Sequence, residues 1–130
     1  MEKVKTRKVH IDDLHFENKL WLKQLAFYKD ELTIFQKRLD ELALRNDKDT
    51  AIGIEKFQNQ LFIHNTNLEK LVRDIHRSET VILEAAQENI VAIDHRLFAD
   101  HQEERKNMQT YERLFADYKR EFYEFLGTWL

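Results

Sequence analysis

The feature that most constrains this chain is the near absence of residues that interrupt a helix. Over 130 residues there is no proline, and glycine occurs only at Gly53 and Gly127. Turn-rich β folds depend on these two residue types, and so do the glycine-rich loops that bind nucleotides. With so few breaks available, most of the chain must be α-helix.

The first helix is predicted by an apolar repeat with alternating steps of four and three residues. This spacing is the period of helices that pack side by side as in coiled coils. It predicts a helix over about residues 11–46. The polar stretch 45–50 then predicts a turn, with Asp49 or Thr50 as the N-cap of the next helix. The members of the repeat are Leu14, Asn18, Trp21, Leu25, Tyr28, Leu32, Phe35, Leu39 and Leu42.

Two further repeats with the same spacing follow, over residues 54–85 and 97–129. The two are out of register with each other, so the chain either continues as one helix with a shifted repeat or turns back between them. A single helix over 50–129 would be roughly 120 Å long, which is too long for one compact domain. The register shift therefore favours a hairpin.

The hairpin is expected over residues 87–94, although its turn signal is weak. An earlier break at 76–80, with Ser78 as cap, or a later one at Asp100 stays open. The earlier break, together with a further one near Asn107, would give a fourth helix. The predicted fold class is all-α: an antiparallel up-down-up bundle of three long helices with heptad packing. A four-helix bundle is the alternative.

Charge and composition limit the class of partner and the location. The formal net charge is −3, yet residues 1–10 carry +3, so we expect a basic, flexible N-terminal tail before a single helical domain over 11–130. An acidic body does not favour nucleic acid as a partner. No apolar segment is long enough for membrane insertion, no signal peptide is visible and cysteine is absent. These features predict a cytoplasmic protein.

Polar residues interrupt the apolar repeats at positions that coincide along the bundle. Counting residues from the two turns places Asn18, Ser78 and His101 at one level, with Glu104 one turn away. Buried polar groups of this kind set the register of packed helices, so we predict a polar core layer. His64 interrupts its repeat alone. It is expected to be a buried histidine that hydrogen-bonds a tyrosine hydroxyl or a water molecule.

The same end of the bundle raises an alternative, a metal or ligand site. Asp12 and His15 form one pair at i, i+3 spacing, and His101 and Glu104 form another, so each pair shares a helix face. Di-iron bundles, however, use Glu-x-x-His twice with two further glutamates, and the second pair here has the reverse order. We therefore predict no cofactor and keep metal or ligand binding as the alternative function.

A second set of apolar residues lies outside the repeats. Leu20, Phe27 and Ile34 recur every seven residues, about 100° around the helix from the core edge. Counting residues from the first turn places Phe62 at the same level along the bundle as Ile34. Either a wide core or fourth helix covers them, or they form an interaction surface. Since no G-x-S-x-G motif or phosphate loop is present, we predict a non-enzymatic protein. It would act through protein–protein interaction, as a homodimer or as an adaptor for another helical protein.

Overall fold

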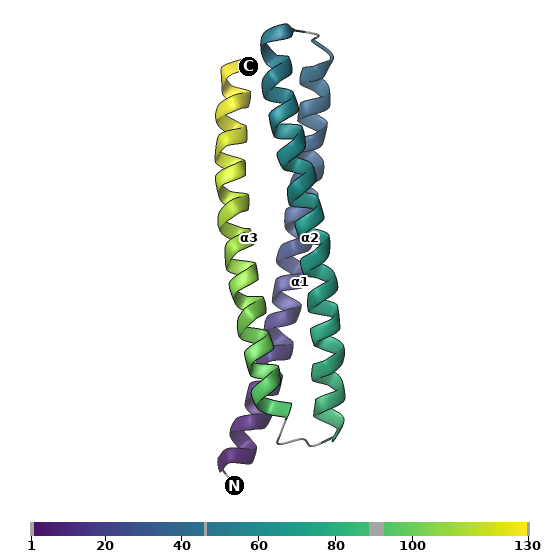
Figure 1. Ribbon diagram of the computed structural model, residues 1–130, viewed down its shortest axis with the longest axis vertical. Helices are drawn as coiled ribbons and strands as arrows, with labels where there is room; N and C mark the ends of the chain where they lie inside the picture. Colours follow the sequence, from purple (N-terminus) through teal and green to yellow (C-terminus); the bar gives the residue numbers. More distant parts are fainter. Residues whose placement is uncertain (1, 46, 89–92, 130) are drawn as a thin grey trace.

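The computed structural model describes residues 2–45, 47–88 and 93–129, with the side chains of 11–45, 47–88 and 96–129. It contains three helices that run up, down and up along one elongated bundle (Figure 1). The described ranges contain no β-strand. The helices are α1 (Glu2–Ala43), α2 (Lys48–Glu88) and α3 (Ile93–Trp129).

This architecture confirms the prediction of an antiparallel bundle of three long helices, and no fourth helix is needed. Helix α2 continues through 76–80, and α3 continues through Asp100 and Asn107, so these alternative breaks are wrong. The predicted hairpin at 87–94 includes residues 89–92, which lie outside the described residues. The chain reverses between the end of α2 and the start of α3, as Figure 1 shows.

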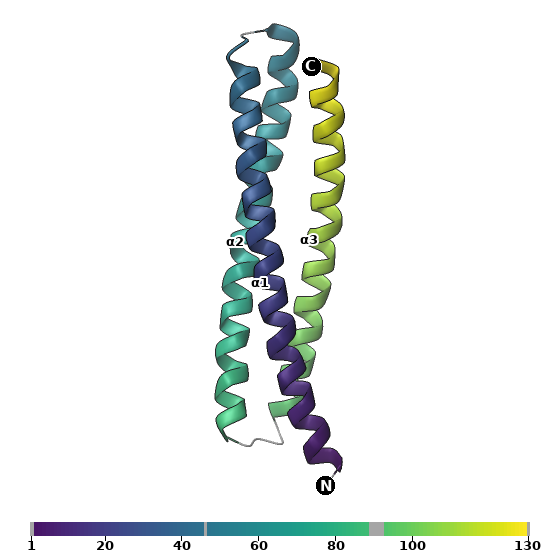
Figure 2. The same ribbon diagram turned by 180° about the vertical axis from the view of Figure 1, so that it is seen from behind.

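The first helix begins earlier than the sequence predicted. Helix α1 starts at Glu2 rather than near residue 11, and its first turns continue beyond the ends of α2 and α3 (Figures 1 and 2). The backbone of 2–10 is therefore helical. That residues 1–10 act as a flexible basic tail stays a prediction, because their side chains lie outside the described set.

The start of α2 is capped by a residue that the sequence analysis did not choose. The backbone N–H of Asp49 donates to the Asp47 carboxylate at 3.1 Å, which is the contact of an N-cap side chain with the second helical residue. The prediction of Asp49 or Thr50 as the N-cap is therefore wrong. Thr50 is buried instead, and its hydroxyl donates to the backbone carbonyl of Asp47 at 2.8 Å.

The core consists of the predicted repeats, but the three helices do not contribute equally. The backbones of α1 and α2 approach closely along an interface rich in leucine, whereas α3 meets α1 mainly through side chains. Rings from α3 fill the space between it and the other two helices. Because aromatic side chains are wide, they set a larger distance between helix axes than leucine does. The buried rings of this cluster are Trp21, Phe35, Phe57, Tyr111, Phe115, Tyr118 and Phe122.

Gly53 has a packing role in α2 that makes a specific prediction. A Cβ added there would lie 2.8 Å from Cζ and 3.2 Å from Cδ1 of Phe125, whose ring packs against Phe57 at 4.8 Å between centroids. Alanine would improve helix propensity by about 1 kcal/mol, but displacing a packed ring costs about 1–3 kcal/mol. We expect Gly53→Ala to lower the free energy of unfolding in urea by about 1 kcal/mol.

The matched control is Gly127→Ala in the last turns of α3. Nothing lies within 4 Å of a Cβ at Gly127. Only the helix-propensity gain remains at this position, so this variant should be neutral or stabilised by up to about 1 kcal/mol. Equal stability changes in the two variants would contradict the close approach of Phe125 to Gly53.

Candidate functional site

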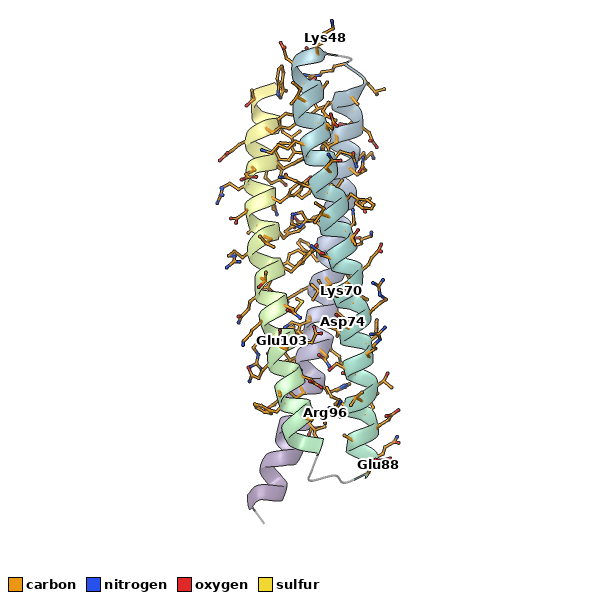
Figure 3. All side chains as sticks on the ribbon, in the orientation of Figure 1. Lys48, Lys70, Asp74, Glu88, Arg96 and Glu103 are labelled. Atoms are coloured by element: carbon orange, nitrogen blue, oxygen red, sulfur yellow. The ribbon has the colours of Figure 1, made fainter. Side chains whose placement is uncertain are left out.

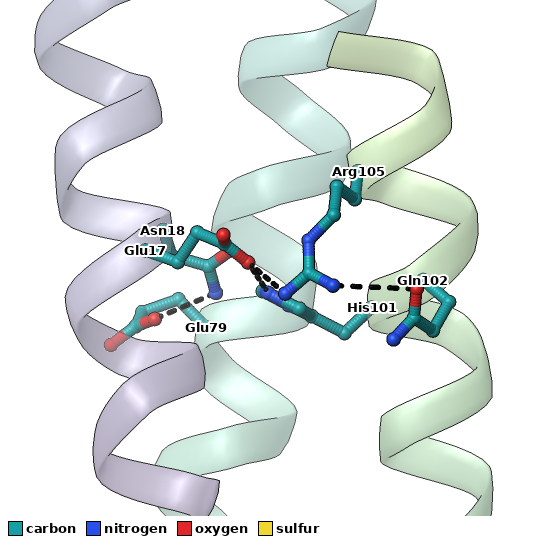
Figure 4. Close-up of polar contacts among 6 residues, drawn as sticks. All are labelled: Glu17, Asn18, Glu79, His101, Gln102 and Arg105. Carbon is teal, nitrogen blue, oxygen red and sulfur yellow. Dashed lines mark hydrogen bonds and ion pairs between the residues drawn. The ribbon is translucent and has the colours of Figure 1, made fainter. Parts of the chain in front are cut away.

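A polar layer divides the core of the bundle into two apolar clusters. Between them lie Asn18 and His101, whose exposed fractions are 0% and 1%. The structure therefore brings together two of the three residues that the sequence analysis placed at one level (Figure 4). The smaller cluster, toward the start of α1, consists of Leu14, Ile82, Ala85 and Leu97.

On the side between α1 and α3, the layer is a charged hydrogen-bond network. Glu17 accepts hydrogen bonds from His101 Nε2 at 2.5 Å and from Arg105 Nη2 at 2.8 Å, both to Oε1. Arg105 also donates to the Gln102 side chain at 3.4 Å (Figure 4). The Trp21 indole stacks on the His101 ring, with centroids 4.8 Å apart and planes at 18°. The network ties the first half of α1 to α3.

Burial and hydrogen bonding together set the protonation states in this network. Burial lowers the pKa of His101 below its ordinary value, and the hydrogen bond to Glu17 opposes this only in part. The ring is therefore neutral at pH 7, with Nε2–H donating to Glu17. Burial also opposes ionisation of Glu17, but its bonds with Arg105 and His101 outweigh this and hold its pKa below the ordinary value. Glu17 and Arg105 thus form an ion pair beside a neutral histidine.

On the side between α1 and α2, the layer is completed by Glu79. Asn18 Nδ2 donates to Glu79 Oε2 at 2.9 Å, and the other oxygen of Glu79 pairs with the ring of His15. Ser78 is half-buried next to Glu79 and takes no part in these contacts. Glu17 and Glu79, which complete the layer, were both missed by the sequence analysis.

Glu104 lies one turn from His101 but has different neighbours. It is half-buried, and burial raises its pKa, with the carboxylates of Asp74 and Glu103 adding to the effect and Lys70 opposing it. Figure 3 shows these three neighbours on α2 and α3 in the lower half of the bundle. One oxygen of Glu104 is buried without a hydrogen-bond partner among the described residues.

The metal site considered as the alternative is not assembled. Asp12 is exposed, His15 pairs with Glu79, and His101 pairs with Glu17. Among the residues that the structure describes, no group of three or more histidine, aspartate or glutamate side chains could hold a metal ion. The His101 ring is also closed to solvent, so a bound molecule could touch it only if α1 and α3 separated.

His64 lies on α2 beside a tyrosine, as expected, but it is half-buried and its hydrogen bonding differs from the prediction. Its ring lies 4.9 Å from that of Tyr118, and burial lowers its pKa. The predicted bond from a tyrosine hydroxyl to the ring does not form. Tyr111 donates instead to the backbone carbonyl of His64 at 3.3 Å, and Tyr118 donates to that of Phe57 at 3.0 Å. The buried Nδ1 of His64 has no partner among the described side chains.

The apolar residues outside the repeats of α1 are exposed. The exposed fractions are 46% for Leu20, 61% for Phe27 and 53% for Ile34, and Phe16 extends the row at 67%. No described helix covers them, so the wide core or fourth helix considered as an alternative is absent from the described ranges. We call Phe16, Leu20, Phe27 and Ile34 the α1 outer row.

Helical spacing places this row on the flank of α1 that faces α3. Leu20 follows Glu17 by three residues, and Ile34 follows Glu31 by three, so each pair shares a face. Both glutamates form ion pairs with α3, at 2.8 Å and 2.9 Å. The row therefore lies outside the groove between α1 and α3.

Phe62, which was predicted to join this row, lies on a different flank. It is 71% exposed and shares its face of α2 with Gln58 and Asn65, four residues before and three after it. Both of these residues hydrogen-bond α1, at 2.8 Å and 2.9 Å. Phe62 therefore points to the α1–α2 side, and the four predicted interface residues do not form one patch.

The α1–α2 side also carries an open groove that the sequence analysis did not find. Its volume is about 530 Å³, and both of its walls come from α1 and α2. Leu22, Leu25, Ala26, Leu68 and Val72 form its apolar surface, and Lys29, Glu69, Arg73 and His76 border it.

No protein-family model, curated protein or solved structure matches this chain. Within the described helices, no stretch is both long and apolar enough to cross a membrane. The function must therefore be inferred from the residues of the chain itself.

Proposed function

We propose that this protein acts without catalysis, by binding another protein through the α1 outer row, and that the partner is a second copy of the same chain. The observation that carries the proposal is the exposure of Leu20, Phe27 and Ile34 on a helix whose opposite face fills the core. Single exposed apolar side chains are ordinary, whereas several that recur along one face of a helix favour an interaction surface.

The row is suited to a helical partner. Its members recur at helical spacing along one helix, so a second helix can lie along it and cover all of them. Fully burying one leucine, isoleucine or phenylalanine side chain stabilises by about 1.5–3 kcal/mol. An adaptor role, in which a different helical protein covers the same row, is the alternative.

A cytoplasmic location is likewise proposed, on the lack of cysteine in the sequence.

The test is the molar mass in solution of the unmodified chain and of Phe27→Glu. Light scattering on a size-exclusion column should give a dimer for the unmodified chain. The variant should dimerise at least about tenfold more weakly, because a glutamate carboxylate would lose its hydration inside the apolar interface. Its helix content by circular dichroism should not change, since Phe27 is 61% exposed.

The control is Ile52→Glu, which places the same charge at a position that is 79% exposed near the start of α2. It should leave the dimer intact. An unmodified chain that stays monomeric at high micromolar concentration would refute self-association, and equal effects of the two substitutions would refute the α1 outer row as its site.

A further inference from the structure

The α1 outer row has one cation and one anion placed on either side of its centre. Lys23 precedes Phe27 by four residues and Asp30 follows it by three, and both are exposed. Seven residues separate the two charges, about 10 Å along the helix, so they cannot pair with each other. Neither forms an ion pair with a described residue.

These charges distinguish between the two ways in which α1 can pack on a second copy of itself. A parallel arrangement in register places Lys23 opposite Lys23 and Asp30 opposite Asp30, so that like charges face each other. An antiparallel arrangement that crosses at Phe27 places Lys23 of each chain next to Asp30 of the other. Complementary charges of this kind set orientation in packed helices.

Apolar contacts agree with the antiparallel arrangement. With the crossing point at Phe27, Leu20 of one chain meets Ile34 of the other, because both lie seven residues from the centre. The same arrangement brings the two Phe27 rings together at the axis. Since the same patch serves both chains, the contact closes as a two-fold dimer and does not extend into a filament.

Phe27 also lies at the middle of the bundle. The ring of the adjacent Tyr28 contacts Tyr111, the central residue of α3, at 5.8 Å between centroids. Lys29 hydrogen-bonds Asn65 at 2.9 Å, within one turn of Leu68, the central residue of α2. An axis at Phe27 therefore lets two bundles overlap along the whole of α2 and α3.

We infer that a second copy of this chain packs antiparallel on α1, with the two-fold axis at Phe27 and ion pairs from Lys23 of each chain to Asp30 of the other. The inference rests on the proposed function, because it names the orientation of the partner on the same row. It adds a specific pairing that self-association alone does not require.

Charge reversal tests the pairing. Lys23→Glu and Asp30→Lys should each weaken dimerisation by roughly three- to tenfold, since each substitution replaces attraction by repulsion at two symmetric positions. The double variant should recover the affinity of the unmodified chain to within about twofold, because both ion pairs form again with the positive and negative charges exchanged. Arg113→Glu, an exposed position on α3, is the control for net charge. Additive losses in the double variant would overturn the inference.

Cross-linking tests the orientation, and the lack of cysteine in the chain makes every introduced thiol unique. Lys23→Cys and Asp30→Cys chains are mixed, allowed to exchange and treated with a short bis-maleimide. The expected product joins Cys at 23 of one chain to Cys at 30 of the other. Dominant 23–23 or 30–30 products, or no product from a protein that is dimeric by mass, would overturn the antiparallel inference alone. A strictly monomeric protein would refute the proposed function as well.

Discussion

Replacing Phe122 with alanine is expected to lower the free energy of unfolding by about 3–5 kcal/mol. The side chain is fully buried. Its ring contacts Phe35 on α1 at 4.8 Å and Phe57 on α2 at 5.6 Å between centroids, so it joins all three helices. The cavity left by alanine cannot collapse easily, because neighbouring rings such as Tyr118 are held by their own contacts.

The measurement is urea denaturation followed by circular dichroism, with the denaturant slope compared between variants. The matched control is Phe62→Ala, the same substitution at a position that is 71% exposed, where we expect a change below about 1 kcal/mol. A loss below about 1.5 kcal/mol for Phe122→Ala would show that the aromatic cluster does not hold α3 on the other two helices.

The fold could be predicted because helix packing leaves a periodic signal that needs no tertiary information. The three repeats and the register shift between the second and third favour three antiparallel helices, although the weak turn signal left a four-helix bundle as the alternative. Counting residues from the turns even predicted which residues lie level. It placed Phe62 level with Ile34, which would put Gln36 level with residue 60, whereas Gln36 hydrogen-bonds Gln58. The error is about half a helical turn.

Helix ends were predicted less well, for a physical reason. Asp47, Asp49 and Thr50 are all good N-cap residue types, so composition cannot choose among them. The observed cap depends on where the backbone leaves the helical conformation. Near the start of α1, the residues at 3–8 are mostly lysine and arginine, which are good helix formers and leave no stop signal. The helix therefore extends to Glu2, well before the first residue of the apolar repeat.

Only the two fully buried residues of the polar layer could be predicted. Asn18 and His101 are visible in the sequence because they interrupt an apolar repeat. Glu17 and Glu79 lie beside the repeats, where charged residues are ordinary, so nothing marks them as partners. Residue counting gives the level along the bundle but not the flank of the helix. This also explains why Phe62 was grouped with a row that lies on another side.

Acidification from pH 7 to pH 5 is expected to destabilise the fold through two histidines. Burial lowers the pKa of His64 and of His101, so the unfolded chain binds their protons more readily than the folded chain does. Their contribution to stability is therefore complete above the ordinary histidine pKa of about 6.5 and is lost as the pH falls below it. While a histidine stays neutral in the folded state, the free energy of unfolding falls by up to about 1.4 kcal/mol per pH unit for that histidine.

The two nearby carboxylates with shifted pKa values, Glu17 and Glu104, act in opposite directions. Glu17 has a lowered pKa, so its stabilising effect is lost only below its ordinary value of 4.5. Glu104 has a raised pKa, so the folded state takes up its proton first, and this uptake stabilises the fold as the pH falls toward 4.5. Glu104 therefore opposes the destabilisation that the two histidines cause as the pH falls.

The measurement is the free energy of unfolding in urea at pH 7, 6 and 5 for the unmodified chain, His64→Gln and His101→Gln. The control is His76→Gln at an exposed position. Each core variant should show a weaker dependence on pH, whatever its stability at pH 7, because one proton-linked group is gone. Unchanged pH dependence in both core variants would contradict neutral, buried histidines in the folded state.

His64 should contribute more to this pH dependence than His101. Protonated His101 would still donate to the Glu17 carboxylate, and that contact partly offsets the cost of burying a cation. Among the residues that the structure describes, no carboxylate offsets burial at His64, whose ring is packed against Tyr118 and whose pKa is lowered by burial. We therefore expect His64→Gln to flatten the pH profile more than His101→Gln. The reverse order would mean that Arg105, which also bonds Glu17, makes the protonation of His101 costlier than burial makes the protonation of His64.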